Sequence, residues 1–159
     1  MSAPEPALLR RGRAASERCA ARLERSLRRL RTLLPIDPAD LPALADRQQD
    51  DIDAFLKRFE QLVLTLQDQV FVGLAIQEGE DPRELSRRDV TELMERLRAI
   101  PSAVDFRALV VIRNRLAHLY PEQPERQAAN LNAAYEAAPR LLEAARQAAR
   151  RASRTPDDI

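Results

Sequence analysis

Side chains capable of acid–base or nucleophilic chemistry are scarce in this chain. It contains one histidine, His118, and one cysteine, Cys19. A structural zinc site needs four ligands and an internal disulfide needs two cysteines, so both are excluded. We therefore expect no metal and no cofactor, and any imidazole chemistry must come from His118.

The residues around His118 combine several functional groups within two helical turns. On a helical wheel at 100° per residue, Arg113 lies in the middle of an apolar arc, about 20° from Phe106. Tyr120 returns to the same face, and Asn114 and His118, spaced i and i+4, lie together beside it. An arginine centred on an apolar face is costly unless it is paired or functional. The segment thus presents a guanidinium, an amide, an imidazole and a phenol just before a proline.

Three of these residues also have purely structural explanations. Arg113 could pair with a carboxylate of the preceding long helix, either Asp68 or Glu60. The imidazole of His118 would be favoured at a helix C-terminus by the helix dipole. Tyr120 could be an ordinary amphipathic tyrosine at the end of a helix. Each explanation accounts for one residue, whereas a shared site would account for all of them.

The segment resembles a known family. Arg113-x4-His118 matches the R-x4-6-H signature of HEPN domains, and Asn114 is the polar residue often found directly after that arginine. Arg113-x4-His118-x-Tyr120 matches the fuller R-x4-H-x-Y pattern of the HepT toxins. The resemblance covers roughly residues 45–150 and includes the position of the motif at the end of a penultimate helix.

The resemblance implies a small helical homodimer whose Arg113 and His118 face a cleft at the subunit interface and cleave RNA without metal. Such cleavage needs a base, an acid and positive charge on the phosphorane. His118 can transfer protons near neutral pH, Arg113 can clamp phosphate oxygens, and Asn114 could orient the imidazole or a phosphate oxygen. Since one chain supplies one imidazole, a pair of histidines requires a C2 dimer. The expected product is a 2′,3′-cyclic phosphate.

The resemblance also implies regulation as the toxin of a type VII-like toxin–antitoxin module. HepT-like toxins are paired with a minimal nucleotidyltransferase antitoxin that adds AMP to the motif tyrosine, here Tyr120. An added phosphate and adenosine would block the cleft and neutralise Arg113. Two alternatives stay open: a non-catalytic HEPN accessory or substrate-binding subunit of a nucleotidyltransferase, and a structural helical dimerisation module.

The composition favours an all-α protein. The 159 residues suit a single domain, which we place at 1–159. Aromatic residues make up 4% and there are 3 glycines, which is poor material for a β-sandwich or a phosphate-binding loop. Ala, Leu, Arg and Glu dominate. The longest apolar run, Val70 to Ile76, is too short to span a membrane.

The charges balance overall but are segregated along the chain. The 26 basic and 25 acidic residues include nine Arg against three acids in residues 1–34, and eight basic against fifteen acidic residues in 35–100. The Arg- and Ala-rich start has the composition of a mitochondrial presequence, but it has no obvious cleavage region, and we expect a cytoplasmic protein. Its arginine face could hold RNA, an acidic partner or only water.

The periodicity of apolar residues and the positions of helix-breaking residues predict five helices. Apolar spacings of three and four predict a helix over about 14–34. A second stripe, from Ile52 to Leu74, predicts the longest helix, which ends near Gly79. Ser86 and Ser102, each with Asp three residues on, predict capped helices to about 100 and 120. The last helix is predicted over 125–152, with Pro139 kinking or splitting it and a frayed tail at 153–159. Short connections predict an up-and-down bundle of four to five helices, and the resemblance implies that this bundle is HEPN-like.

Overall fold

The computed structural model describes residues 7–117 and 122–154, and this part of the chain is helical throughout, without a β-strand. The prediction of an all-α protein is confirmed. The helices are α1 (Ala7–Leu30), α2 (Asp46–Thr65), α3 (Phe71–Gln77), α4 (Arg87–Arg96), α5 (Ala103–Leu116) and α6 (Pro124–Ser153). Shorter turns are the 3₁₀ segments η1 (Pro38–Ala43) and η3 (Pro82–Glu84) and the π-helical η2 (Leu66–Val70).

Helix α1 begins and ends earlier than its apolar spacing predicted. The predicted start near residue 14 is wrong because the buried face of the helix extends back to Leu9 and Gly12. The predicted end at Leu34 is also wrong, since α1 stops at Leu30. Leu34 precedes Pro35, and a residue before proline is disfavoured in the helical conformation. Leu34 is nevertheless buried, so it contributes to the core from outside the helix.

The predicted longest helix is present as α2, η2 and α3 in direct succession. It begins at Asp46, before its first apolar residue, and the side-chain oxygen of Gln48 accepts a hydrogen bond from the Ala45 N–H at 2.9 Å. In η2 the Phe71 N–H donates to the Leu66 carbonyl, which is the i to i+5 bond of a π-turn. The run ends just before Gly79, whose φ of +84° suits glycine.

Two serines cap the next two helices as predicted. At α4 the Ser86 hydroxyl accepts from the Asp89 N–H at 3.0 Å, while the Asp89 carboxylate accepts from the Ser86 N–H at 3.1 Å. The Ser86 hydroxyl also donates to the Asp89 carboxylate at 2.7 Å, and this hydrogen bond, together with the one from the Ser86 N–H, holds the pKa of Asp89 below its ordinary value. At α5 the Ser102 hydroxyl accepts from the Asp105 N–H at 3.1 Å. Helix α4 ends at Arg96 rather than at residue 100.

The last helix, α6, passes through Pro139 as one continuous helix, so the predicted split is wrong. Proline removes one backbone hydrogen bond and crowds the preceding turn. Pro139 lies on the exposed side of α6, where that turn faces solvent. The helix includes Ser153, the first residue of the predicted frayed tail, and residues 155–159 lie outside the described residues.

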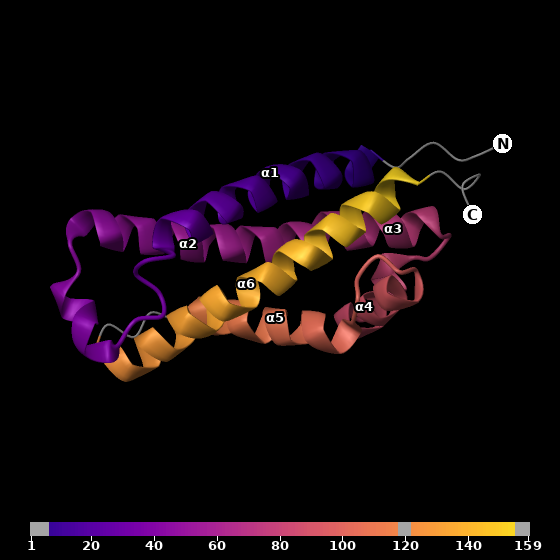
Figure 1. Cartoon of the computed structure of the whole chain (residues 1–159). Helices are drawn as coiled ribbons and strands as arrows, with labels where there is room; N and C mark the ends of the chain where they lie inside the picture. The colour runs from indigo at the N-terminus through magenta and orange to yellow at the C-terminus, as the bar shows by residue number, and fades with distance from the viewer. Residues whose placement is uncertain (1–6, 118–121, 155–159) are drawn as a thin grey trace.

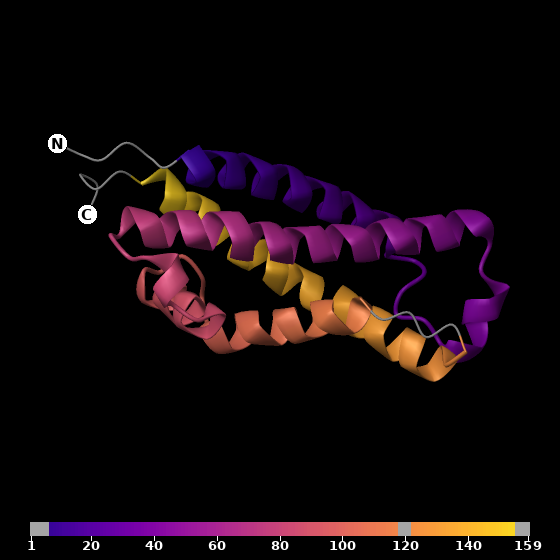
Figure 2. The same cartoon turned by 180° about the vertical axis from the view of Figure 1, so that it is seen from behind.

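The long helices run alternately up and down (Figure 1). Helix α1 is followed by the antiparallel α2–α3 run, then by α5 and finally by α6, while the short α4 lies in the connection between α3 and α5. Figure 2 shows α2 between α1 and α5, with α6 crossing behind them. Helices α1 and α5 both pack against α2 and α6. This arrangement leaves one face of α5 and one face of α1 free of the bundle.

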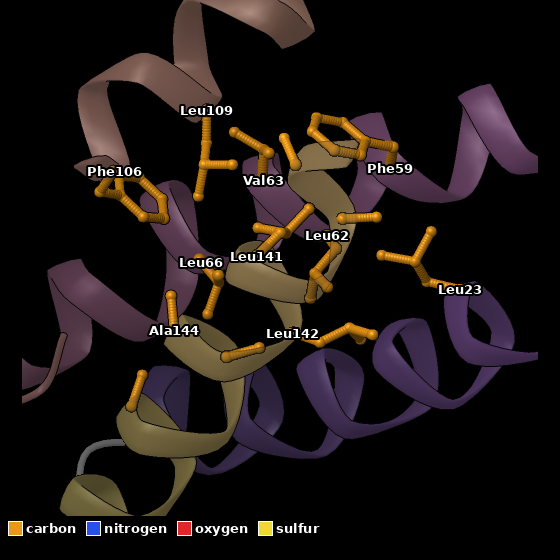
Figure 3. Close-up of a cluster of buried hydrophobic side chains, with 14 of the residues drawn as sticks. Leu23, Phe59, Leu62, Val63, Leu66, Phe106, Leu109, Leu141, Leu142 and Ala144 are labelled. Carbon is orange, nitrogen blue, oxygen red and sulfur yellow. The ribbon is translucent and has the colours of Figure 1, made fainter. Parts of the chain in front are cut away.

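The core is formed where α2 and η2 meet α1, α5 and α6 (Figure 3). Phe59, Leu62, Val63 and Leu66 of the long helix are fully buried. Their neighbours are Leu23 of α1, Phe106 and Leu109 of α5, and Leu141, Leu142 and Ala144 of α6. Burying one such large side chain contributes roughly 1.5–3 kcal/mol. The motif helix α5 is thus attached to the bundle by its apolar face.

Two glycines let α1 approach the long helix closely. A Cβ atom at Gly12 would lie 2.7 Å from Cβ of Gln69, and one at Gly73 would lie 2.9 Å from Cα of Leu9. Both distances are shorter than side chains tolerate, and the second involves backbone. The absence of side chains at these two positions therefore sets the spacing between α1 and the α2–α3 run.

We predict that Gly73→Ala destabilises the protein by about 1–3 kcal/mol, because the new methyl group overlaps the Leu9 backbone. At an ordinary helical position the same change would stabilise by roughly 0.5–1 kcal/mol. Urea unfolding followed by circular dichroism measures the difference. A more stable variant would contradict the close approach of the two helices.

Candidate functional site

Helix α5 carries the candidate residues and is fixed at its N-terminal end. Besides the Ser102 cap, the Ala103 N–H donates to the Glu95 carboxylate of α4 at 2.5 Å. Phe106 is buried, and its ring lies 4.9 Å from the ring of Phe71, centroid to centroid. These contacts fix the rotation of α5 and therefore decide which of its residues face α2.

Arg113 lies in the last turn of α5 and is half-buried against α2, with a side chain that is 25% exposed. Its Nη2 donates to the Glu60 carboxylate at 3.4 Å, and Nη1 donates to the Asn114 side-chain oxygen at 3.0 Å. Of the two predicted carboxylate partners, Glu60 is confirmed, whereas Asp68 pairs with Arg87 at 3.1 Å. The structural explanation for Arg113 therefore has a physical basis.

The guanidinium of Arg113 is not saturated by these partners. Its Nε is buried and has no hydrogen-bond partner within residues 7–117 and 122–154. The distance to Glu60 is long for a charge-assisted hydrogen bond, and Lys57 shares the same carboxylate at 3.6 Å. Asn114 is exposed. The guanidinium of Arg113 is therefore held in one orientation but is only weakly paired with Glu60, so it could bind an anion at the end of α5.

Two candidate residues lie outside the described residues. Helix α5 ends at Leu116, with Ala117 as its C-cap, whereas the sequence predicted a helix reaching 119 or 120. His118 and Tyr120 fall in the segment 118–121, which is not described. The structure thus brings Arg113 together with Asn114 and Glu60. The predicted juxtaposition of Arg113 with His118 and Tyr120 stays a prediction.

Other charged side chains form contacts that the sequence did not reveal. Arg151 is buried at the end of α6, where it donates to the Glu78 carboxylate at 2.7 Å and to the Leu97 carbonyl at 3.1 Å. It ties α6 to the ends of α3 and α4. An arginine on the Ala-rich face of α6, three residues after the buried Ala148, was the available signal.

Arg58 of α2 is the second such residue. Its Nη1 donates to the Ser26 hydroxyl at 2.7 Å and to the Arg22 carbonyl at 3.2 Å. It therefore stands among the arginines of α1. The sequence could not show this, because the pairing of α1 with α2 is a tertiary contact.

Within the described ranges, no group of three or more His, Cys, Asp or Glu residues is arranged to hold a metal ion. In the same residues no helix combines the length and apolarity needed to cross a membrane.

Comparisons of the chain with family models, with curated proteins and with solved structures gave no match. Functional inference therefore depends on the motif, on the geometry of α5 and on the distribution of charge.

Proposed function

We propose that this chain is the toxin component of a HepT-like toxin–antitoxin module and acts as a metal-independent endoribonuclease. The observation that carries the proposal is the sequence pattern Arg113-x4-His118-x-Tyr120, whose arginine lies in the last turn of α5. The helical up-and-down arrangement is compatible with a HEPN-like bundle. Each of the motif residues has a distinct role in the chemistry.

The proposed reaction is an internal attack within RNA. A base removes the proton of the 2′-hydroxyl, the 2′-oxygen forms a bond to phosphorus, and the bond from phosphorus to the 5′-oxygen breaks. An acid protonates the leaving 5′-oxygen, so the products are a 2′,3′-cyclic phosphate and a 5′-hydroxyl. His118 is the proton-transfer group, because imidazole titrates near neutral pH. Arg113 stabilises the charge of the phosphorane, with Asn114 holding its guanidinium.

Arg113 suits this role because its position is fixed without being fully neutralised. The Glu60 contact at 3.4 Å and the Asn114 contact at 3.0 Å orient the guanidinium. The planar guanidinium can donate two parallel hydrogen bonds to two phosphate oxygens, which an ammonium group cannot do in the same geometry. We infer that the substrate phosphate competes with Glu60 for the exposed edge of Arg113.

A dimer follows from the need for two imidazoles, and α5 offers a surface for it. Val104 is 65% exposed and Val111 is 47% exposed, and the exposed Ala108 lies between them on the same stripe. Helix α5 thus has apolar side chains on the face that packs against the bundle and also on the opposite, exposed face. This pattern is typical of a helix that is buried on both sides. We propose that a second copy of the chain covers this stripe and brings two His118 residues to one cleft.

For the dimer, we predict that the double substitution Val104→Asp and Val111→Asp yields a folded monomer, because it places charge on the apolar stripe. Light scattering after size-exclusion chromatography reports the mass. The matched control is Ile76→Asp, which changes an exposed apolar residue of α3 that is 44% exposed and should leave the dimer intact. A monomeric wild-type chain would contradict the proposal.

For the nuclease, we predict that the wild-type chain arrests growth and cleaves RNA, whereas His118→Ala relieves the arrest and slows cleavage by about 100-fold or more. Arg113→Lys should slow cleavage by a similar factor through loss of the fork. Its stability should change by less than about 1 kcal/mol, because lysine can still pair with Glu60.

These assays also separate a structural Arg113 from a functional one. If Arg113→Lys unfolds the protein more easily but cleaves RNA normally, the residue serves only the Glu60 pair. If the wild-type chain is harmless and purified protein cleaves no RNA, the nuclease proposal is wrong. Product analysis should find 2′,3′-cyclic phosphate ends, and 3′-hydroxyl ends would exclude the proposed attack.

A second candidate is a non-catalytic HEPN accessory or substrate-binding subunit of a nucleotidyltransferase. The Arg113–Glu60 pair favours it, because a guanidinium that already has a carboxylate partner needs no substrate to explain it. The two candidates differ in RNA cleavage, since the accessory subunit would bind the nucleotidyltransferase whether or not His118 is intact.

We propose that a partner nucleotidyltransferase neutralises the toxin by AMPylation of Tyr120. The transferred AMP joins the phenolic oxygen of Tyr120 through phosphorus, and pyrophosphate leaves from ATP. We predict that mass spectrometry after co-expression finds one added AMP group on the wild-type chain and none on Tyr120→Phe. The contrary outcome is that cells survive the wild-type chain only when the partner is co-expressed, yet the chain purified from them carries no AMP. In that case AMPylation is not the mechanism of neutralisation.

A further inference from the structure

Five arginines of α1 form a single exposed line, which we call the arginine stripe. Its members follow each other at spacings of seven, four, three and four residues: Arg11, Arg18, Arg22, Arg25 and Arg29. On a helical wheel they fall within about 60°. At a rise of 1.5 Å per residue, the stripe is roughly 27 Å long. All five side chains are exposed.

Within residues 7–117 and 122–154, carboxylates neutralise little of the charge of the stripe. Among the described residues, Arg29 has a carboxylate partner in Asp51 at 3.9 Å, which is a weak contact, and the other four form no ion pair. The two acidic residues of α1 lie toward α6 instead. Glu24 pairs with Arg146, and Glu17 lines the groove between α1 and α6. Both carboxylates therefore lie about 120° around α1 from the centre of the arginine stripe, on the side that carries Arg13 and Arg28.

Arg58 of α2 adds a sixth positive charge beside the stripe. Its hydrogen bonds to Ser26 and to the Arg22 carbonyl fix its guanidinium at the seam of the two helices. Burial lowers the pKa of Arg58 from its ordinary value, and repulsion from three arginines of the stripe lowers it further. Asp51 opposes this effect. The site is strongly electropositive.

Such an arrangement costs stability in the isolated chain. Like charges at i and i+3 or i+4 repel each other by a few tenths of a kcal/mol per pair, and the stripe contains three such pairs. A helix that only needed solubility would alternate glutamate with arginine on this face. A polyanion bound along the stripe would offset the repulsion between its arginines and would explain why they are spaced so closely.

We propose that the arginine stripe, with Arg58, binds the phosphate backbone of single-stranded RNA and holds the substrate by sequence-independent contacts. Guanidinium groups bind phosphate oxygens through two parallel hydrogen bonds, and a strand offers a regular row of them. The stripe contains no aromatic side chain, so its contacts are expected mainly with phosphates and not with specific bases. It also lacks the aromatic and apolar centre of protein interfaces. The choice of RNA rests on the proposed nuclease function.

The location of the stripe suits a strand that continues toward the candidate site. Helix α2 lies between α1 and α5 (Figure 2). Arg58 lies where α2 meets α1, Glu60 lies where α2 meets Arg113 of α5, and Lys57 is exposed between these two edges with a side chain that is 66% exposed. A strand crossing the outer face of α2 would meet positive charge at both edges.

The test measures RNA binding separately from cleavage. The probe is a single-stranded 2′-O-methyl oligonucleotide long enough to span the stripe, which lacks the attacking hydroxyl and stays intact. The triple variant Arg18→Gln, Arg22→Gln, Arg25→Gln should bind it about tenfold more weakly or worse. The slope of log affinity against log salt should fall by about 2, as three phosphate contacts to a single strand are lost.

The matched control is Arg83→Gln, Arg96→Gln, Arg140→Gln, which removes the same charge from exposed positions elsewhere. It should bind the probe within twofold of wild type. Circular dichroism and thermal midpoints establish that both variants are folded. Since Gln preserves helix propensity and the stripe repels itself, the triple variant should be at least as stable as wild type.

Each outcome bears on the proposal. Equal weakening in both triple variants means that net charge alone drives binding, and it overturns the stripe as a site. Unchanged RNA binding with weakened binding of polyglutamate assigns the stripe to an acidic protein surface instead. A wild-type chain that does not bind the probe also overturns it. If RNA is never cleaved but probe binding still depends on the stripe, the nuclease proposal fails and this one stands.

Discussion

The α2–η2–α3 run carries apolar side chains toward three neighbours at once, and the positions of the other helices follow from covering them. Phe59, Leu62 and Leu66 are fully buried within it. Helices α1, α5 and α6 all contact this run. Because each of its buried faces packs against one neighbour, the polar residues at the edges of these faces are also positioned: Arg58 meets α1, and Glu60 meets α5. Both charged sites of the molecule are thus built on the borders of one buried surface.

The sequence predicted the parts of the fold that depend on neighbouring residues. Ser86 and Ser102 could be identified as caps because the capping residue and its partner are three positions apart. The long helix could be identified because a continuous apolar stripe is a strong signal. The start of α1 was missed because Gly12 is buried by contact with Gln69 and Val70, which no local pattern shows. The predicted split of the last helix at Pro139 was wrong because the destabilisation that a proline causes depends on whether its side of the helix is exposed, which the sequence does not show.

For the candidate site as well, the sequence predicted local spacing but not the contacts between distant segments. Helical spacing placed Arg113 among apolar residues, and the long helix offered Asp68 or Glu60 as a partner. The structure shows Glu60 at 3.4 Å, whereas Asp68 pairs with Arg87. The Asn114 contact was not foreseen, since the sequence suggested that this amide would orient the imidazole or a phosphate. Arg58 lay beyond prediction, because its partners are 32 and 36 residues away in sequence. Counting charges by segment showed a basic first helix, but only packing shows that Glu17 and Glu24 lie toward α6 and away from the arginine stripe.

The two proposed surfaces are compatible because they lie on different helices. Val104 and Val111 are exposed on the outer face of α5, whereas the arginine stripe belongs to α1, which packs against α2 and α6. A C2 partner that covers α5 would leave α1 open and would duplicate the stripe by symmetry. The shared cleft would then have one basic helix from each subunit, on the far side of that subunit's α2. Dimerisation would thus complete the pair of imidazoles without covering the surface proposed to hold RNA.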